Sequence, residues 1–366
     1  MDERLCLLAL RLVPGIGPKR ITALLDRYGS AQEAWRARGT WDEVPGIGTA
    51  LAAAARRVDE RLVETHWHRL AAMGARVVTS GDADYPPGLH QVPSPPPVLF
   101  VKGALPPAAQ PSLAIVGTRR ASPYGLRTAR TLGRDLAAVG VAVISGLARG
   151  VDTAAHRGAL DGQGTTVAVL GSGLDVVYPP ENRDLMEEIA VNGALVTEYP
   201  LGTQPQPGHF PARNRIIVGL AQGVVLVEGS RRSGAMRTVA IATDCGREVM
   251  AVPGDADRWG SDGPNHLVRE GAALVRHAVD VLDTMGWAAM FPAMEIAAGC
   301  DPEQVPGLQD VTARLLVALQ ASATLTIDEL AAMVEAPVGT IVGALIGLEL
   351  AGRVIRLPGG RFSLPR

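Results

Sequence analysis

Arginines follow two glycine-containing turns in the middle of the chain. The first turn, in the segment AIVGTRRASPYG, contains Arg119 and Arg120, and the second, in VAVISGLARG, contains Arg149. Each turn follows a short apolar run and precedes a helical pattern, and the backbone N–H groups at a helix start can bind a phosphate. Because guanidinium groups pair with phosphate through two hydrogen bonds, these turns predict binding of a polyanion rather than of a neutral metabolite.

Positive charge is concentrated around the first of these turns. Residues 113–134 contain five arginines and no acidic residue, although the whole chain has a formal net charge of −2. A chain with this balance must build any nucleic-acid-binding patch locally. The sequence therefore predicts one local polyanion site and not a globally basic surface.

Further small, polar and basic residues follow the later apolar runs. Ligands of open parallel sheets bind beyond the carboxyl ends of the strands, where these residues would meet. Arginine can pair with phosphates and stack on bases, so a run of nucleotides fits this edge. The predicted contact residues are Gly117, Thr118, Arg119, Arg120, Ser145, Gly146, Arg149, Gly150, Arg183, Arg213, Asn214, Arg215, Ser233 and Gly234.

Three titratable side chains near the same edge are better explained as structural groups. His156 could act as a general base, but a histidine inside such a helix more often fixes a neighbouring loop by a hydrogen bond. Glu198 and Glu228 could form a catalytic pair, yet acids at strand ends more often hold arginine side chains in place. We therefore predict no catalytic residue.

Nucleotide-hydrolysing and dinucleotide-binding classes do not fit the motifs. The only lysines are Lys19 and Lys102, and neither completes the GxxxxGK[ST] pattern of a Walker-type ATPase. Arg119 stands where a GxGxxG fingerprint starting at Gly117 would need its second glycine. No acidic residue ends the second strand to bind a ribose, so a dehydrogenase is disfavoured and no cofactor is predicted.

Cysteine usage and hydropathy predict the compartment. Cys6, Cys245 and Cys300 are widely spaced and form no metal-ligand pattern. No apolar run reaches the length of a membrane span, and the N-terminus MDERLCLLAL does not resemble a signal peptide. We expect a reduced, cytoplasmic protein without structural disulfides, metal or membrane insertion.

The patterning predicts an α/β fold with three domains. Residues 1–75 are helical and repeat the motif VPGIG, which resembles a tandem helix–hairpin–helix (SAM-like) domain. Residues 76–286 contain a Pro-rich connector and then alternate short apolar strands with helices, as in an extended Rossmann-like, doubly wound parallel sheet. A linker, 287–307, leads to residues 308–366.

The C-terminal segment predicts a winged helix. Three helical patterns are followed by a hairpin with its turn at Gly359–Gly360, and Thr326 suits a helix N-cap. The third helix contains no arginine or lysine before Arg353. This pattern favours a winged helix that contacts protein or has a regulatory role. Sequence-specific binding of a DNA duplex remains the alternative.

Several segments together resemble the DNA-processing protein A family (DprA, also called Smf) of natural transformation. They lie within residues 80–280 and read IVGTRRASPYG, SGLARGVDTAAHRGALDGQGTTVAVLGSGLDVVYPPEN, FPARNRIIVGLAQGVVLVEG, RSGAMRT and AVPG. The resemblance implies a Rossmann-like domain that binds and protects single-stranded DNA without sequence preference and is not catalytic. It also implies a homodimer that helps load the recombinase RecA onto DNA past single-strand-binding protein.

Particular residues carry this resemblance or depart from it. Thr118 replaces the family's common serine and keeps a hydroxyl, and Arg183 stands where the family has a lysine. The family dimerises through the far end of its Rossmann-like domain, which corresponds to NHLVREGAALV here. The resemblance thus implies a dimer face that includes Leu267, Val268 and Leu274.

Two other classes of function remain as alternatives. Related Rossmann-like enzymes process nucleotide monophosphates with a PGGxGTxxE signature, which AVPGDADRWG does not contain. A transcription regulator could read duplex DNA with the winged helix while the central domain senses a phosphorylated ligand. Catalytic turnover of nucleotides would favour the first, and tight duplex binding by residues 308–366 would favour the second.

Overall fold

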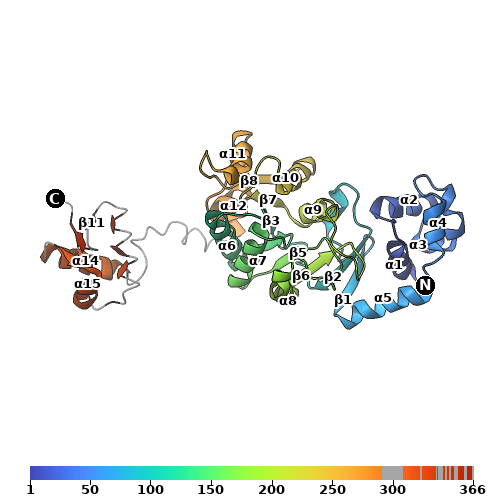
Figure 1. Cartoon of the computed structure of the whole chain (residues 1–366), viewed down its shortest axis with the longest axis horizontal. Helices are drawn as coiled ribbons and strands as arrows, with labels where there is room; N and C mark the ends of the chain where they lie inside the picture. The colour runs from blue at the N-terminus through green and yellow to red at the C-terminus, as the bar shows by residue number, and fades with distance from the viewer. Residues whose placement is uncertain are drawn as a thin grey trace. The chain divides into compact units, whose positions relative to one another are not determined.

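The structure is a computed structural model with two compact units, Met1–Met290 and Phe291–Arg366 (Figure 1). It describes residues 1–290 and, in the second unit, residues 308–321, 324–334, 336, 341–342, 344–345, 348–349, 353–357 and 361–364. Within these ranges, no helix has the length and apolar character to cross a membrane. In the same ranges, no group of His, Cys, Asp and Glu side chains could hold a metal ion.

Short helices built around the repeated motif begin the first unit. Both copies of VPGIG bury their valine and isoleucine, and Gly15 and Gly46 adopt left-handed φ angles of 84° and 82°. Arg20 donates to the carbonyl oxygens of Gly15 (2.6 Å) and Gly46 (2.9 Å), which joins the two copies. The elements are α1 (Glu3–Leu12), α2 (Pro18–Tyr28), α3 (Ala31–Arg36), η1 (Arg38–Glu43), α4 (Thr49–Ala55) and α5 (Glu60–Ala72).

A nine-stranded sheet forms the centre of this unit. Its order is β1-β2-β6-β5-β4-β3-β7-β8-β9, and all neighbours from β6 to β9 are parallel. Strands buried on both faces need nearly continuous apolar sequence, as in LAIV at residues 113–116. The strands are β1 (Ala75–Thr79), β2 (Val98–Gly103), β3 (Ser112–Val116), β4 (Ala142–Ser145), β5 (Thr166–Val169), β6 (Gly193–Thr197), β7 (Gly223–Leu226), β8 (Glu248–Ala251) and β9 (Ala273–Leu274).

Helices cover both faces of the sheet. Because successive strand residues point to opposite faces, Leu195 packs in one core with Leu185 of α8, and Val196 packs in the other with Ile216 of α9. The doubly wound α/β architecture predicted from the sequence is thereby confirmed. The helices are α6 (Pro123–Ala138), α7 (Val151–Asp161), α8 (Arg183–Asn192), α9 (His209–Leu220), α10 (Gly234–Asp244), α11 (Asp262–Arg269) and α12 (Ala278–Thr284), with short 3-10 turns η2 (Pro87–Gln91), η3 (Pro180–Asn182), η4 (Trp259–Ser261) and η5 (Ala288–Met290).

The Pro-rich connector is more ordered than its composition suggested. It contributes two strands, β1 and β2, which pair antiparallel with each other and extend the sheet through β2 and β6. Leu99, Phe100 and Val101 are buried in β2, as their apolar character predicts. The antiparallel extension was not predicted, because strand direction depends on pairing and not on local sequence.

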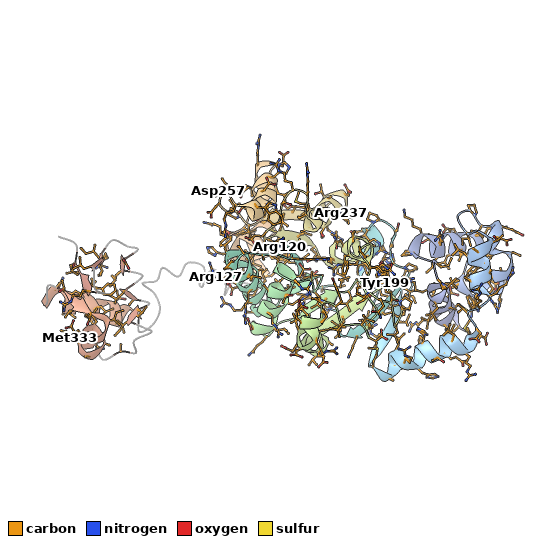
Figure 2. The ribbon with its side chains drawn as sticks, viewed as in Figure 1. Arg120, Arg127, Tyr199, Arg237, Asp257 and Met333 are labelled. Carbon is orange, nitrogen blue, oxygen red and sulfur yellow. The ribbon has the colours of Figure 1, made fainter. Side chains whose placement is uncertain are left out.

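The N-terminal helices pack directly on this sheet. Leu8 of α1 and Phe100 of β2 belong to one hydrophobic core. Tyr199, labelled in Figure 2, lies at the same junction. The Arg11 guanidinium lies 5.4 Å from the centre of its ring and donates to the Glu198 carbonyl oxygen at 2.7 Å. The helices therefore support the edge of the sheet next to the strand ends.

The direction of winding reverses at β3. The chain runs from β3 outward through β4, β5 and β6, and then returns to β7 on the other side of β3. In doubly wound sheets, ligands bind in the crevice that opens at the carboxyl ends of the strands where this reversal occurs. The turn formed by Gly117, Thr118 and Arg119 lies at that point.

The second unit contains a small core and a three-stranded sheet of order β10-β12-β11. Leu315, Leu330 and Phe362 are buried together, and Thr326 and Glu329 cap the second helix reciprocally. The predicted turn at Gly359–Gly360 and linker residues 291–307 lie outside the described residues. The elements are α14 (Leu308–Ala321), β10 (Leu325–Thr326), α15 (Ile327–Val334), β11 (Ile355–Leu357) and β12 (Arg361–Ser363).

Candidate nucleic-acid interface

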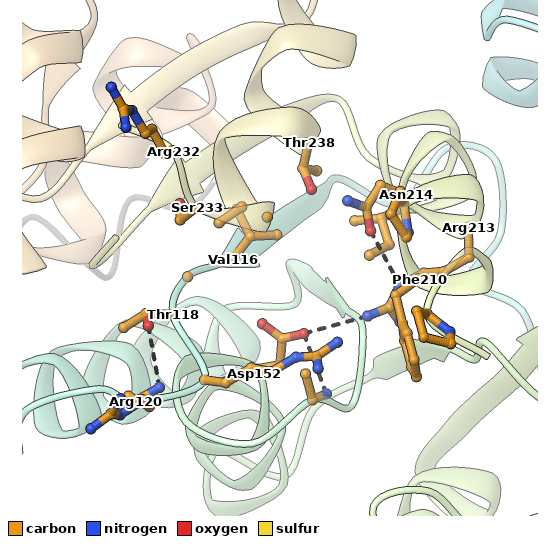
Figure 3. Close-up of a pocket in the computed structure, with 18 of the residues that line it drawn as sticks. Val116, Thr118, Arg120, Asp152, Phe210, Arg213, Asn214, Arg232, Ser233 and Thr238 are labelled. Atoms are coloured by element: carbon orange, nitrogen blue, oxygen red, sulfur yellow. Dashed lines mark hydrogen bonds and ion pairs between the residues drawn. The ribbon is translucent and has the colours of Figure 1, made fainter. Parts of the chain in front are cut away.

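A pocket of about 630 Å³ opens at the carboxyl end of β3 (Figure 3). Arg232 and Ser233, near the start of α10, lie across it from Phe210 and Arg213 of α9. The lining includes backbone turns, prolines, arginines, polar side chains and three aromatic side chains. The lining residues are Val116, Gly117, Thr118, Arg119, Arg120, Ala148, Asp152, Tyr178, Pro205, Gln206, Pro207, Phe210, Pro211, Arg213, Asn214, Ile217, Ser230, Arg232, Ser233, Gly234, Ala235, Thr238 and Trp259.

The turns after β3, β4 and β7 are packed against one another. The Thr118 N–H donates to the Glu228 carbonyl oxygen at 2.7 Å, and the Val151 N–H donates to the Thr118 carbonyl oxygen at 3.3 Å. Gly150 has a φ of 78°, and a Cβ atom there would collide with the Thr118 carbonyl oxygen. A glycine is therefore required where the second arginine-bearing turn crosses the first.

Arg119 lies on an aromatic ring at the mouth of the pocket. Its guanidinium carbon is 4.7 Å from the centre of the Phe210 ring, and that ring is 5.3 Å from the ring of Tyr178. Arg119, Arg120 and Arg232 are exposed, and none of them has a carboxylate within ion-pair distance among the described residues. These guanidinium groups are available to pair with a bound anion.

Arg213 is a buried brace beneath the pocket. Its side chain is 5% exposed and donates to the carbonyl oxygens of Gly146, at 2.5 Å, and Val169, while Asp152 lies 3.9 Å away. Burial lowers the pKa of Arg213 to about 10 and raises that of Asp152, although Arg213 partly offsets the second effect. The guanidinium thus connects the turns after β4 and β5.

Other predicted contact residues already have protein partners. Arg215 pairs with Glu198 at 2.8 Å, with both side chains nearly buried, and does not line the pocket. The Ser145 hydroxyl donates to the Ile115 carbonyl oxygen at 2.6 Å, inside the sheet. Arg149 forms an exposed ion pair with Glu181, which lowers the pKa of that carboxyl, and lines a smaller neighbouring pocket with Arg119 and Gly146.

Comparison with known proteins decides the family. A family model described as DNA recombination-mediator protein A matches residues 76–286, which is more than half of the chain. A model described as the DprA winged helix domain matches residues 301–360. The chain belongs to the DNA-processing protein A (DprA/Smf) family. The family that the sequence motifs suggested is therefore confirmed.

Individual relatives agree with this assignment. Protein Smf from Synechocystis sp. is 33% identical over 400 residues, covering 99% of each chain. The X-ray structure of DprA from Streptococcus pneumoniae has 33% identity and a TM-score of 0.68, covering 77% of this chain and 98% of that one. A DprA structure from Helicobacter pylori, whose subject is its single-stranded-DNA binding mode, has 30% identity and a TM-score of 0.52, covering 58% and 95%.

The structure brings most of the predicted family motif residues together but separates a few. Gly117, Thr118, Arg119, Arg120, Arg213, Asn214, Ser233 and Gly234 line the pocket. Arg183 is exposed at the start of α8 and lines neither this pocket nor the smaller one. Leu267 and Val268 are half-buried on α11, and Leu274 is 42% exposed on the edge strand β9.

The titratable side chains behave largely as structural groups. His156 is fully buried, its Nδ1 lies 2.7 Å from the Thr166 hydroxyl, and burial lowers its pKa to about 3. Glu198 holds Arg215, as predicted. Glu228 does not hold an arginine, because its carboxylate accepts from the backbone N–H (2.8 Å) and hydroxyl (2.5 Å) of Ser122 at the start of α6.

Phe210, Arg232 and Trp259 line the pocket but were not among the predicted contacts. Phe210 precedes the predicted Arg213 in the FPARN motif, and Arg232 precedes Ser233, so adjacency in the sequence could have indicated both. Trp259 follows β8 by several residues and lies outside the AVPG motif that ends at Gly254. Its position at the pocket depends on how the turns after β7 and β8 pack, which local sequence does not reveal.

Proposed function

We propose that this chain binds single-stranded DNA in the pocket at the carboxyl end of β3 and thereby takes part in DNA processing. The observation that carries the proposal is the exposed Arg119 guanidinium, held over the Phe210 ring at the point where the winding reverses. Such a group can pair with a phosphate while neighbouring ring faces stack on bases. The binding mode studied in the Helicobacter pylori relative supports the same ligand.

Binding is expected to be independent of base sequence. Guanidinium groups, backbone turns and aromatic rings are prominent among the groups that line the pocket. Guanidinium and backbone N–H groups position the sugar–phosphate chain without reading bases, and an aromatic ring stacks on any base. The proposed contacts comprise the pocket-lining members of the predicted set, with Arg213 acting beneath them.

The proposed role is handling of the strand rather than chemistry on it. His156 and Glu198 are engaged in buried contacts and are not placed to move a proton on a ligand. We propose that the chain protects the strand, helps load RecA past single-strand-binding protein and acts as a homodimer, as the family motifs imply. In this proposal residues 76–286 hold the DNA, flanked by residues 1–75, the linker 287–307 and residues 308–366.

Substitution of Arg119 tests the site. Arg119→Ala should weaken binding of an oligo-dT about tenfold or more, because a charge-assisted phosphate contact is lost. The thermal midpoint should not change, because the side chain is exposed and supports no buried group. Fluorescence anisotropy of a labelled oligonucleotide gives the affinity, and a thermal melt gives the stability.

Arg130→Ala is the matched control. Arg130 is an exposed arginine on α6 that pairs with Asp161 at 2.5 Å and does not line the pocket. Its substitution should leave the DNA affinity within about twofold of the original, because Arg130 does not line the pocket. Folding should not be impaired, since surface ion pairs contribute little to stability. Equal affinities for the Arg119 and Arg130 variants would contradict the assignment of the site.

A further inference from the structure

Trp259 is a large aromatic side chain that packing does not explain. It is 61% exposed, whereas Trp35, Trp41 and Trp287 are at most 9% exposed and Trp67 is half-buried. It lines the pocket, and its indole has no stacking or cation partner among the described residues. Exposure of an indole removes the apolar burial that would normally stabilise it, so its position needs another reason.

The backbone that carries Trp259 is fixed. The Gly229 N–H donates to the Gly260 carbonyl oxygen at 2.7 Å, and the Gly263 N–H donates to the Gly229 carbonyl oxygen at 2.8 Å. The neighbouring Ser261 is 4% exposed. These bonds join the turn that follows β8 to the turn that follows β7, so the indole is presented from a rigid support.

The charge near Trp259 favours an anionic ligand. The exposed Arg232 lines the same pocket and has no carboxylate partner in the described part of the chain. Of the acidic residues close to Trp259 in the sequence, Asp262 is paired with Arg231 at 2.9 Å and Asp255 with Arg258 at 3.8 Å, and the exposed Asp257 does not line the pocket. An aromatic face and an unpaired guanidinium in one pocket can bind a nucleotide, the ring by stacking on its base and the guanidinium by pairing with its phosphate.

Trp259 and Phe210 lie on different sides of the pocket. Phe210 contacts Gly171, just after β5, whereas Trp259 is joined to the turn after β7. In the sheet, β5 and β7 are separated by β4 and β3. Three strand spacings place the ends of β5 and β7 about 14 Å apart, so the two rings enter the pocket from different sides.

We propose that Trp259 stacks on a nucleobase of the bound single-stranded DNA, and that this base belongs to a different nucleotide from the one nearest Arg119 and Phe210. The inference rests on the proposed function of the same pocket. It extends the DNA path across the strand ends from β5 to β8. Trp259 thereby sets which stretch of the strand the protein covers, without selecting its sequence.

Two substitutions and two ligands test this inference. Trp259→Ala in the full chain should weaken oligo-dT binding about tenfold, and Trp259→Phe should restore most of the affinity, because a phenyl ring also stacks. An abasic oligonucleotide of equal length should bind all three proteins equally. Val191→Ala, at an exposed residue of α8 at the other end of the sheet, is the control and should match the original chain.

A spectroscopic readout accompanies the affinities. Since the other tryptophans are less exposed, oligo-dT should quench the emission of the original chain much more than that of Trp259→Phe. Equal oligo-dT affinity for Trp259→Ala and the original chain would overturn the inference. An equal loss of affinity for abasic DNA would overturn it too. So would a lower molar mass of Trp259→Ala in solution, because dissociation of an oligomer would assign the indole to a protein contact. If the original chain did not bind oligo-dT, the result would contradict the proposed function itself and not only the role of Trp259.

Discussion

At the scale of single residues, two arginines at the pocket have different roles because they are buried to different extents. Arg119 is exposed and lies on an aromatic ring, so its charge is available to a ligand. Arg213 is nearly buried and uses its guanidinium on carbonyl oxygens and on Asp152. Water screens the charge of Arg119 but not that of Arg213. Substitution of Arg119 should therefore lower DNA affinity, and substitution of Arg213 should lower folding stability.

Arg213→Ala should destabilise the protein. The substitution removes the positive charge that faces buried Asp152, leaving it only backbone donors, and removes the guanidinium that donates to two carbonyl oxygens, which costs about 3–5 kcal/mol in comparable buried pairs. Urea unfolding, compared with Arg119→Ala, measures this loss. An unchanged stability together with lost DNA affinity would contradict the bracing role and would make Arg213 a direct DNA contact.

His156 should make stability depend on pH. Burial lowers its pKa from 6.5 to about 3, so between these values the unfolded chain binds a proton that the folded chain does not. Stability is therefore lost as pH falls below 6.5, by up to about 1.4 kcal/mol per pH unit. Between pH 7 and pH 5, His156→Asn should lose about 2 kcal/mol less than the original chain in urea unfolding. Parallel pH profiles of the two proteins would refute this.

Residue type and position after a predicted strand indicated which side chains reach the strand ends. They did not indicate which of these side chains lack a protein partner and can contact a ligand. The predicted contacts included Arg119, just after a predicted strand, and Arg213 and Arg215, near the start of a predicted helix. The structure buries Arg215 against Glu198 because α9 packs that face on the sheet. Burial of an arginine depends on such distant partners, which local sequence does not contain.

At the scale of elements, the apolar runs predicted all the parallel strands because each is short and bounded by glycines or helices. The sequence did not predict that β1 and β2 join the sheet antiparallel, because strand direction depends on pairing with distant strands and not on local sequence. At the opposite end, β9 is the edge strand, and among the described strands it pairs only with β8. An unpaired edge with an exposed Leu274 is a surface that can pair with a second copy.

Leu274→Asp should therefore separate the proposed homodimer. A buried carboxylate at the edge would have no partner in the dimer, so association should weaken. Sedimentation should give a dimer mass for the original chain and a monomer mass for the variant at the same concentration. Val191→Asp, at the exposed residue on α8, should remain dimeric. A monomeric original chain, or a dimeric Leu274 variant, would speak against this face.

At the scale of the whole molecule, the charge distribution decides what kind of partner is possible. The net charge of −2 excludes a generally basic surface, yet Arg119, Arg120 and Arg232 gather unpaired positive charge around one pocket. Most other exposed arginines in the central sheet region, such as Arg130 and Arg276, are paired with acids. Binding should thus be local, electrostatic and sensitive to salt.

The most direct measurement is a titration of the full chain with single-stranded and double-stranded oligonucleotides of mixed sequence at several salt concentrations. We expect tighter binding of the single strand, similar affinities for unrelated sequences, and a log–log salt slope of roughly −3, as for about four neutralised phosphates. Preference for the duplex, or binding that does not change with salt, would contradict the account.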